Sequence, residues 1–343
     1  MSKDLTRKST GQLLMDNAII IVLLFLLIGF VIKDPAFLSL TNVSNILSQA
    51  STNIIIALGV AGLIVTQGTD LSAGRQVGLA AVISASLLQS PENVSRMYQA
   101  LPPILSSQFI IVALIIACIA CGFLGFLNGV VIAHLKVTPF ITTLGSMIII
   151  YGLSSTYVDR EPNGAQPIGG FTANFTEFAQ GGIDIGSFRL PYLVIYAAIT
   201  TVFMWVLWNK TRFGKNMFAV GGNPEAAVVS GVNIKKTLIS VYTLAGVLYG
   251  LAGTLEAARI GTATNNTGNM YELDAIAACV VGGVSFTGGI GKIGGVIIGV
   301  LMFQIISYGL NFSSVSPYWQ YIIKGLIIIA AVAIDTRKYL KKN

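Results

Sequence analysis

Long apolar segments recur along this sequence and constrain its fold more than any other feature. A helix that crosses a membrane needs about 20 predominantly apolar residues, and ten segments approach that length. They lie near 17–33, 50–67, 73–90, 108–134, 138–157, 191–209, 238–258, 271–286, 293–311 and 317–335. Only 10% of the residues are charged, which excludes an ordinary soluble domain. We therefore predict an all-α polytopic membrane protein, a single transmembrane domain over 1–343 with about ten spans.

The basic residues predict which ends of the spans face the cytosol. The longest basic interruption, 210–237, holds five Lys and Arg residues and one acid, Glu225. Because Lys and Arg favour the cytosolic side, we expect this loop and both termini in the cytosol. The net charge of +7 is then a topology signal and not a nucleic-acid surface. The other basic residues expected in the cytosol are Lys3, Arg7, Lys8, Arg75, Lys136, Lys292, Arg337, Lys338, Lys341 and Lys342.

The basic loop also contains the signals of one short helix. A favourable N-cap, a proline suited to the first helical position and an acid at the positive dipole end follow one another. Two glycines allow a sharp turn into the helix and a third favours its end. A helix this short is marginal alone, so its small apolar body packs either on a partner or on this chain's own helices. The residues are Gly221, Gly222, Asn223, Pro224, Glu225, Ala226, Ala227 and Gly231.

Two stretches rich in glycine and small polar residues interrupt the apolar pattern, at 66–74 (TQGTDLSAG) and 281–289 (VGGVSFTGG). Non-helical backbone at membrane depth is tolerated where it lines a cavity, so both are interpreted as helix breaks on a solute path. Tight turns between spans are the alternative. Together with polar residues on helices between them, the candidate path residues are Gln67, Thr69, Asp70, Ser72, Asn128, Thr142, Thr143, Ser285 and Thr287.

Ionisable residues at membrane depth are few, and each costs about 2.5–3.5 kcal/mol at a helix centre. Asp70 either holds the first break in shape, by accepting from N–H groups that begin the next helix, or lies on the solute path. Glu256 and Arg259 are three positions apart, so we expect a local ion pair.

The expected outer connections carry weaker signals. Residues 34–50 alternate polar and apolar side chains, which predicts an interfacial helix with Thr41 as a possible cap, or a plain linker. The connection 158–190 is long and rich in Gly, Asn and Phe. It is either a docking surface or a mobile loop.

No pattern in the sequence predicts chemistry within the chain. There is no GxxxxGK[ST], GxSxG or HExxH, so we expect no ATP hydrolysis by a P-loop, no catalytic residues and no cofactor. A single histidine and three cysteines inside apolar runs predict packing thiols and no metal site.

Three stretches carry a resemblance to a known family: TRFGKNMFAVGGNPEAAVVSGVNIKK in the basic loop, residues 54–81 and residues 271–291. They are similar to the permease subunits of bacterial ATP-binding-cassette sugar importers of the ribose, xylose and galactose type, and the likeness covers nearly the whole chain. It implies a multi-pass protein of the inner membrane that translocates a small neutral sugar, galactose or a methylgalactoside. It also implies three partners: a cytoplasmic ATPase subunit that contacts the short helix, a periplasmic sugar-binding protein, and a second permease copy in a homodimer.

Two alternatives to an ATP-driven importer exist. An ion-coupled secondary sugar transporter needs a carboxylate that titrates, which Asp70 or Glu272 would supply. A passive channel or a structural membrane subunit needs no titrating carboxylate. Neither alternative uses a basic loop with a preformed docking helix, so the residues favour the importer.

Overall fold

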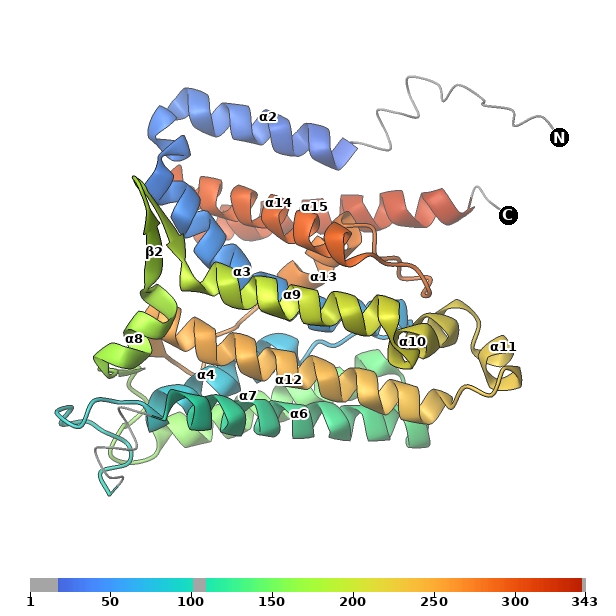
Figure 1. The fold of residues 1–343 in the computed structure, drawn as a ribbon, viewed down its shortest axis with the longest axis horizontal. Coiled ribbons are helices and arrows are strands. Elements are labelled where there is room, and N and C mark those ends of the chain that lie inside the picture. The colour runs from blue at the N-terminus through green and yellow to red at the C-terminus, as the bar shows by residue number, and fades with distance from the viewer. Residues whose placement is uncertain (1–17, 101–108, 341–343) are drawn as a thin grey trace.

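The computed structural model describes residues 18–100 and 109–340. This part of the chain is almost entirely helical, which agrees with the predicted fold class, and its long helices run lengthwise beside one another (Figure 1). They are α2 (Ala18–Lys33), α3 (Leu40–Val65), α4 (Ala73–Leu87), α6 (Ile110–Leu135), α7 (Pro139–Asp159), α9 (Tyr192–Lys210), α12 (Ile234–Ile260), α13 (Tyr271–Val281), α14 (Ile293–Phe312) and α15 (Pro317–Leu340). By length and composition, α3, α6, α7, α9, α12 and α14 are able to cross a membrane. The protein is therefore a polytopic membrane protein.

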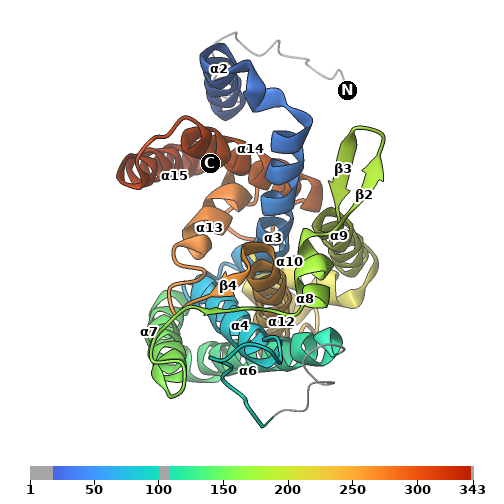
Figure 2. The ribbon, with the colours of Figure 1, turned by 90° about the vertical axis from the view of Figure 1, so that its left-hand side faces the viewer.

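Helix α3 lies at the centre of the bundle. It packs against α9, α12, α13 and α14, and the end-on view places it among them (Figure 2). Its residues from Ile54 to Val65 are all buried, as expected for a helix that is apolar on every side.

Glycine allows two of the helices to approach closely. A Cβ atom at Gly246 of α12 would collide with the carbonyl group of Cys121 on α6, and one at Gly125 of α6 would collide with that of Tyr242 on α12. Small residues at such contacts let helix backbones pack tightly in membranes. The α6–α12 pair consequently forms the most extensive helix contact in the described chain.

One end of the bundle carries two short ribbons and a helix. Strands β1 (Ile168–Gly169) and β4 (Thr262–Ala263) pair antiparallel, as do β2 (Gly182–Ile185) and β3 (Phe188–Pro191). Helix α8 (Ala173–Gln180) lies between them in the sequence. The predicted outer loop is therefore built largely of regular elements, and its use as a docking surface stays a prediction.

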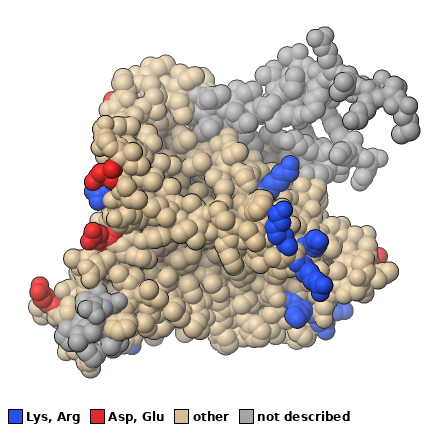
Figure 3. Space-filling model, in the orientation of Figure 1, with Lys and Arg blue, Asp and Glu red and all other residues tan. Residues whose placement is uncertain are grey.

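The opposite end carries α10 (Arg212–Gly222) and α11 (Pro224–Val229). On the face drawn in Figure 3, Lys and Arg gather toward this end and Asp and Glu toward the other. This distribution agrees with a cytosolic position for α10 and α11. Of the basic residues expected at the chain ends, Lys3, Arg7, Lys8, Lys341 and Lys342 lie outside the described residues.

The interfacial helix predicted at 34–50 is wrong. A short 3-10 helix, η1 (Pro35–Leu38), is followed directly by α3, whose first N–H groups are capped by the Ser39 hydroxyl and not by Thr41. Some polar residues of this stretch find partners on α14. Tyr308 donates to Asn42 Oδ1 at 2.7 Å, and the Gln304 amide donates to Gln49 Oε1 at 2.7 Å.

The cytosolic position expected for Arg75 is also wrong. Its guanidinium group donates to Asn269 Oδ1 at 2.7 Å and to the carbonyl of Asn265 at 3.4 Å. Both lie in the connection that follows the end of α12 farthest from α11. The error arose because 73–90 was taken as a whole span, whereas α4 has 15 residues and begins after a break.

Candidate functional site

The short helix predicted in the basic loop is present as α11. The Asn223 side chain accepts a hydrogen bond from the N–H of Ala226 at 2.9 Å, and Pro224 is the first helical residue. At the other end Gly231 has a φ of +80°, and the N–H of Val232 donates to the carbonyl of Ala227 at 2.9 Å. This is the left-handed ending that glycine favours. Glu225 lies in the first turn and is exposed.

The two alanines of α11 face opposite ways. Ala227 is buried against its own chain, with an exposed fraction of 3%, whereas Ala226 is exposed. Val228 and Val229 have exposed fractions of 57% and 89%. One side of α11 therefore rests on the protein and the other presents apolar groups outward. The structure therefore confirms packing on the chain's own helices for the Ala227 face, whereas docking of the outward face on a partner stays a prediction.

Helix α10 was missed by the sequence analysis, and it changes the role of two predicted residues. Gly221 and Gly222 are the last residues of α10 and do not form a turn into α11. The spacing of Phe213, Met217 and Val220 places apolar side chains on one face of a helix, which is the signal that would have found it. Met217 and Val220 are buried, so α10 is anchored to the bundle along that face.

The end of α10 meets both predicted breaks. The N–H of Gly289 donates to the carbonyl of Val65 at 2.8 Å, which joins the second break to the end of α3. A Cβ atom at Gly221 would collide with the same Val65 carbonyl, and one at Gly288 would collide with the Gly221 carbonyl. We call this meeting of 65–68, 221–222 and 287–289 the junction.

Gln67 connects the three segments of the junction by hydrogen bonds. Its Nε2 donates to the carbonyl of Gly221 at 2.8 Å and to the carbonyl of Thr287 at 3.0 Å. Gln67 adopts a left-handed backbone conformation with a φ of +61°, which costs a residue other than glycine about 1–2 kcal/mol. The two hydrogen bonds of its side chain offset that strain. Its side chain was predicted to line the path; the structure shows its amide nitrogen bound to two carbonyl groups.

A cavity of about 730 Å³ opens beside the junction on the α11 side. The first break supplies part of its wall through Gln67 and Gly68, and α11 and the start of α12 supply the opposite wall through Val228 and Lys235. Movement of α11 would therefore change the shape of this cavity.

Four of the predicted path residues form a second, deeper cluster. The Oδ1 atom of Asp70 accepts from the N–H of Ser72 at 2.8 Å and from its hydroxyl at 2.5 Å. Asn128 donates to Ser72 Oγ at 3.3 Å, and the N–H of Leu71 donates to Thr143 Oγ1 at 3.1 Å. Asp70, Ser72, Asn128 and Thr143 are all buried. The Asp70 contact matches the shape-holding alternative, because Ser72 is the N-cap residue that immediately precedes α4.

The deeper cluster includes residues that the sequence analysis did not select. The Gln76 amide donates to Ser72 Oγ at 2.9 Å, and the Ser146 hydroxyl donates to Asn128 Oδ1. The Tyr242 hydroxyl donates to the carbonyl of Thr69 at 3.3 Å. A neutral polar side chain inside an apolar helix is the signal that would have found Gln76, and the same signal had selected Asn128.

The remaining path candidates are dispersed. Ser285 and Thr287 share a hydroxyl–hydroxyl hydrogen bond of 3.0 Å within the second break, near Gln67 and away from Asp70. Thr142 and Thr69 are half-buried, and among the described residues the shielded Thr142 hydroxyl has no hydrogen-bond partner. The structure thus places two of the nine predicted residues at the junction, Gln67 and Thr287, and four in the deeper cluster, Asp70, Ser72, Asn128 and Thr143. Ser285 adjoins the junction through Thr287, Thr69 adjoins the deeper cluster through Tyr242, and Thr142 is apart from both.

The second break matches the tight-turn alternative more closely than the first. Helices α13 and α14, on either side of it, pack directly together, with Gly282 against Gly295 and Gly299 against Ala278. The second break is thus a turn between the paired helices α13 and α14, and the tip of this turn, at 287–289, forms part of the junction.

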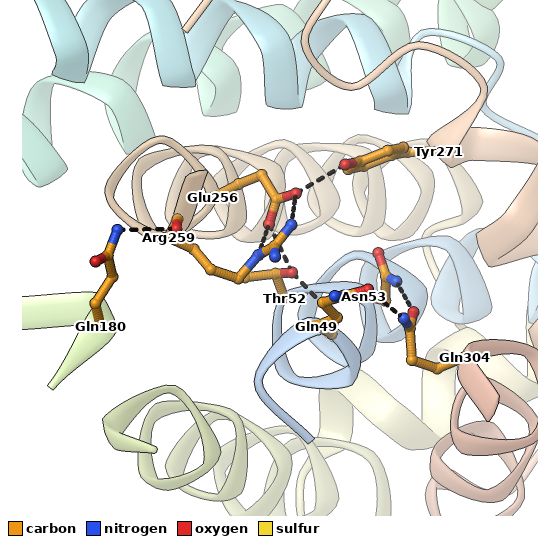
Figure 4. A network of polar contacts seen from close by, with 8 residues as sticks. All are labelled: Gln49, Thr52, Asn53, Gln180, Glu256, Arg259, Tyr271 and Gln304. Atoms are coloured by element: carbon orange, nitrogen blue, oxygen red, sulfur yellow. Dashed lines mark hydrogen bonds and ion pairs between the residues drawn. The ribbon is translucent and has the colours of Figure 1, made fainter. Parts of the chain in front are cut away.

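The predicted ion pair is present, within a larger network near the outer end (Figure 4). Arg259 Nη2 lies 2.7 Å from Glu256 Oε1, and Thr52 and Tyr271 donate to the same carboxylate at 2.9 and 2.7 Å. A second ion pair joins Lys324 of α15 to Asp274 of α13 at 2.6 Å. These contacts satisfy charges that would be costly in lipid.

The chain was compared with known families and proteins. It matches the family described as the permease component of a branched-chain amino acid transport system over residues 42–332. It is 59% identical, over 99% of both chains, to the galactose/methyl galactoside import permease proteins of Salmonella typhimurium and Escherichia coli. It is 37% identical to the ribose import permease protein of Bacillus subtilis, over 92% of this chain and 91% of that one. No solved structure matches significantly. This chain therefore belongs to the family of permease components of branched-chain amino acid and related transport systems, and it is a multi-pass transport subunit, not an enzyme.

Proposed function

We propose that this chain forms the membrane pathway of an ATP-driven importer of galactose or methyl galactoside in a bacterial inner membrane. Two observations support the proposal. Relatives that are 59% identical over 99% of the chain carry that substrate in their names. In addition, the end of α10, which leads directly into the short helix α11, meets both interruptions of the membrane helices, an arrangement suited to control by a separate ATPase subunit.

The full topology has ten spans with both termini in the cytosol. Each predicted span coincides with a helix in the described chain, and six of these helices are long and apolar enough to cross alone. Helices α4 and α13, of 15 and 11 residues, cross together with the breaks that adjoin them.

The junction carries the proposed mechanism. An ATPase subunit that contacts the outward apolar face of α11 would displace α11 and α10 together, because both precede α12 on one continuous loop. Gly221 would then shift against Val65 and Gln67, and the second break would follow through Thr287. Switching an equilibrium from 1:99 to 99:1 takes about 5.5 kcal/mol of differential binding, which closure of an ATP-bound partner can supply.

The solute path uses neutral groups. A hexose has no charge to recognise and must leave as readily as it binds, so hydroxyls, amides and backbone carbonyls suit its passage. In this structure the deeper cluster is closed, since Ser72, Asn128 and Ser146 hydrogen-bond to one another. Opening would exchange these contacts for contacts to sugar hydroxyls, with Asp70 holding the backbone at the start of α4.

Two further partners complete the proposal: a second permease copy and a periplasmic sugar-binding protein. Helix α7 supports pairing with a second permease copy. Gly145 and Gly152 are exposed with open space around them, and small residues favour close helix contact in membranes. Native mass spectrometry of the purified complex would measure the copy number, with two expected.

Reconstitution tests the transport proposal. The permease would be placed in liposomes with its ATPase subunit and binding protein, and uptake of labelled galactose measured with ATP or with an imposed proton or sodium gradient. We expect uptake that requires ATP and is insensitive to either gradient. Gradient-driven uptake by the permease alone would establish the secondary-transporter alternative instead.

A further inference from the structure

A second cavity, of about 520 Å³, lies at the end of the bundle opposite α11. It is enclosed by the first turns of α3, the end of α8, the β2–β3 ribbon and the end of α12. Its polar lining includes Ser44, Ser48, Gln49, Gln180, Arg189 and Arg259. None of these residues belongs to the junction or the deeper cluster.

The α3 side of this cavity is unusual for a membrane helix. Polar side chains within a bilayer need protein partners or water. Gln49 has one such partner, since its Oε1 accepts from Gln304 at 2.7 Å (Figure 4). No hydrogen bond in the described chain engages the Gln49 amide nitrogen or the Ser48 hydroxyl, and both residues line the cavity. This part of α3 is therefore suited to a polar solute.

The α12 side contributes Arg259 without contributing net charge. Glu256 has an exposed fraction of 1% and accepts from Thr52, Tyr271 and both Nε and Nη2 of Arg259. The carboxylate is thus saturated, and it holds the guanidinium group in one orientation. The Arg259 side chain remains 21% exposed and lines the cavity. The Gln180 amide, which donates to the Arg259 carbonyl at 3.1 Å, secures α8 to the same point (Figure 4).

We propose that this outer cavity binds a neutral pyranose on its way into the membrane pathway, an inference that rests on the proposed sugar transport. Its volume falls within the roughly 300–1,000 Å³ of small-molecule sites and accommodates a hexose with several waters. Hydroxyl, amide and guanidinium groups supply donors and acceptors that match sugar hydroxyls. The ion pair with Glu256 means that Arg259 adds no net charge to the lining, to which Arg189 also contributes a guanidinium donor.

The test uses the permease–ATPase complex in nanodiscs, without any binding protein. A Ser48→Cys variant, made in a background with Cys118→Ala, is labelled with a maleimide in the presence of D-galactose or of leucine at the same concentration. We expect galactose to slow the labelling of position 48 several-fold and leucine to leave it unchanged. In parallel, in the liposome uptake assay with the ATPase subunit and the binding protein, Ser48→Trp would fill the cavity and lower galactose uptake at least about tenfold, with normal yield and ATPase association. Ile199→Trp on α9, where Ile199 has an exposed fraction of 63%, is the matched control and should transport normally.

Equal labelling rates with and without galactose, or wild-type uptake by Ser48→Trp, would overturn the proposal. A failure of the cavity proposal can be distinguished from a failure of the transport proposal. If the wild-type complex imports galactose and position 48 is not protected, the cavity proposal fails and the transport proposal stands. If position 48 is protected but the wild-type complex imports no galactose under ATP, the transport proposal fails and the binding site stands.

Discussion

The side-chain amide of Gln67 lies 2.8 Å from the carbonyl oxygen of Gly221, although 154 positions separate the two residues. One belongs to a break between membrane helices and the other ends a helix of the cytosolic loop. In the proposed mechanism, a displacement of the loop is transmitted to the membrane helices through this contact.

Gln67→Leu tests that contact, because it keeps the size of the side chain and removes both hydrogen bonds. A loss of about 1–2 kcal/mol from the coupled state corresponds to roughly a 5- to 30-fold decrease in uptake. ATPase association should be unchanged, since α11 is not altered. Gln166→Leu, at an exposed glutamine of the outer loop, is the control. Normal uptake by Gln67→Leu would mean that Gln67 does not take part in coupling.

Gly221→Ala and Gly222→Ala form a matched pair at the end of α10. A Cβ at Gly221 collides with the Val65 carbonyl, whereas nothing lies within 4 Å of a Cβ at Gly222. We expect Gly221→Ala to lower both uptake and the melting temperature in detergent, and Gly222→Ala to change neither. Equal behaviour of the two variants would contradict the packing described at the junction.

Ala226→Arg and Ala227→Arg separate docking from folding in α11. Ala226 is exposed and Ala227 is buried. The first change should reduce co-purification of the ATPase at normal permease yield, and the second should also reduce the yield. If the ATPase co-purifies at the wild-type level with Ala226→Arg, α11 is not its docking site.

The orientation is tested by cysteines at Ser230, after α11, and Ser187, between β2 and β3, both exposed. In a background with Cys118→Ala, a membrane-impermeant thiol reagent should label Ser187→Cys in intact cells and Ser230→Cys only in inverted vesicles. Labelling of position 230 in intact cells would reverse the whole topology.

Asp70→Asn and Asp70→Leu distinguish the two roles of the buried carboxyl group. Asparagine keeps an acceptor for the Ser72 N–H, so we expect substantial uptake to remain. Leucine removes the acceptor at a buried N–H, which costs about 1–3 kcal/mol, so yield and uptake should both fall. A folded Asp70→Asn variant that binds the ATPase but transports nothing would show that the carboxylate itself is required.

The elements predicted correctly from the sequence are those with local causes. Helix α11 was predicted from Asn223 and Pro224, and the two interruptions from glycine and small polar residues between apolar segments. Six of the apolar spans follow from length and composition. The Glu256–Arg259 pair was found because three positions on one helix place both side chains on the same face.

The errors and omissions depend on contacts between distant segments. Polar residues in 34–50 predicted a membrane-surface helix because their partners on α14 are more than 250 positions away. Arg75 was assigned to the cytosol because its Asn269 partner could not be foreseen. The sequence placed Gly221 in the loop correctly, but only the Val65 carbonyl beside it explains why no larger residue fits.

The contacts of the junction involve backbone groups on nearly every side: the carbonyls of Val65, Gly221 and Thr287 and the N–H of Gly289. Side-chain identity matters there only at the glycines and at Gln67, whereas the outward surface of α11 consists of side chains. In the proposed mechanism, recognition of the ATPase subunit therefore depends on side chains, whereas transmission of its movement depends on backbone contacts. The segment from Asn223 to Ser230 could therefore be exchanged for that of another permease, so that the chain binds the other permease's ATPase subunit, provided that Gly221, Gly288 and Gly289 are retained.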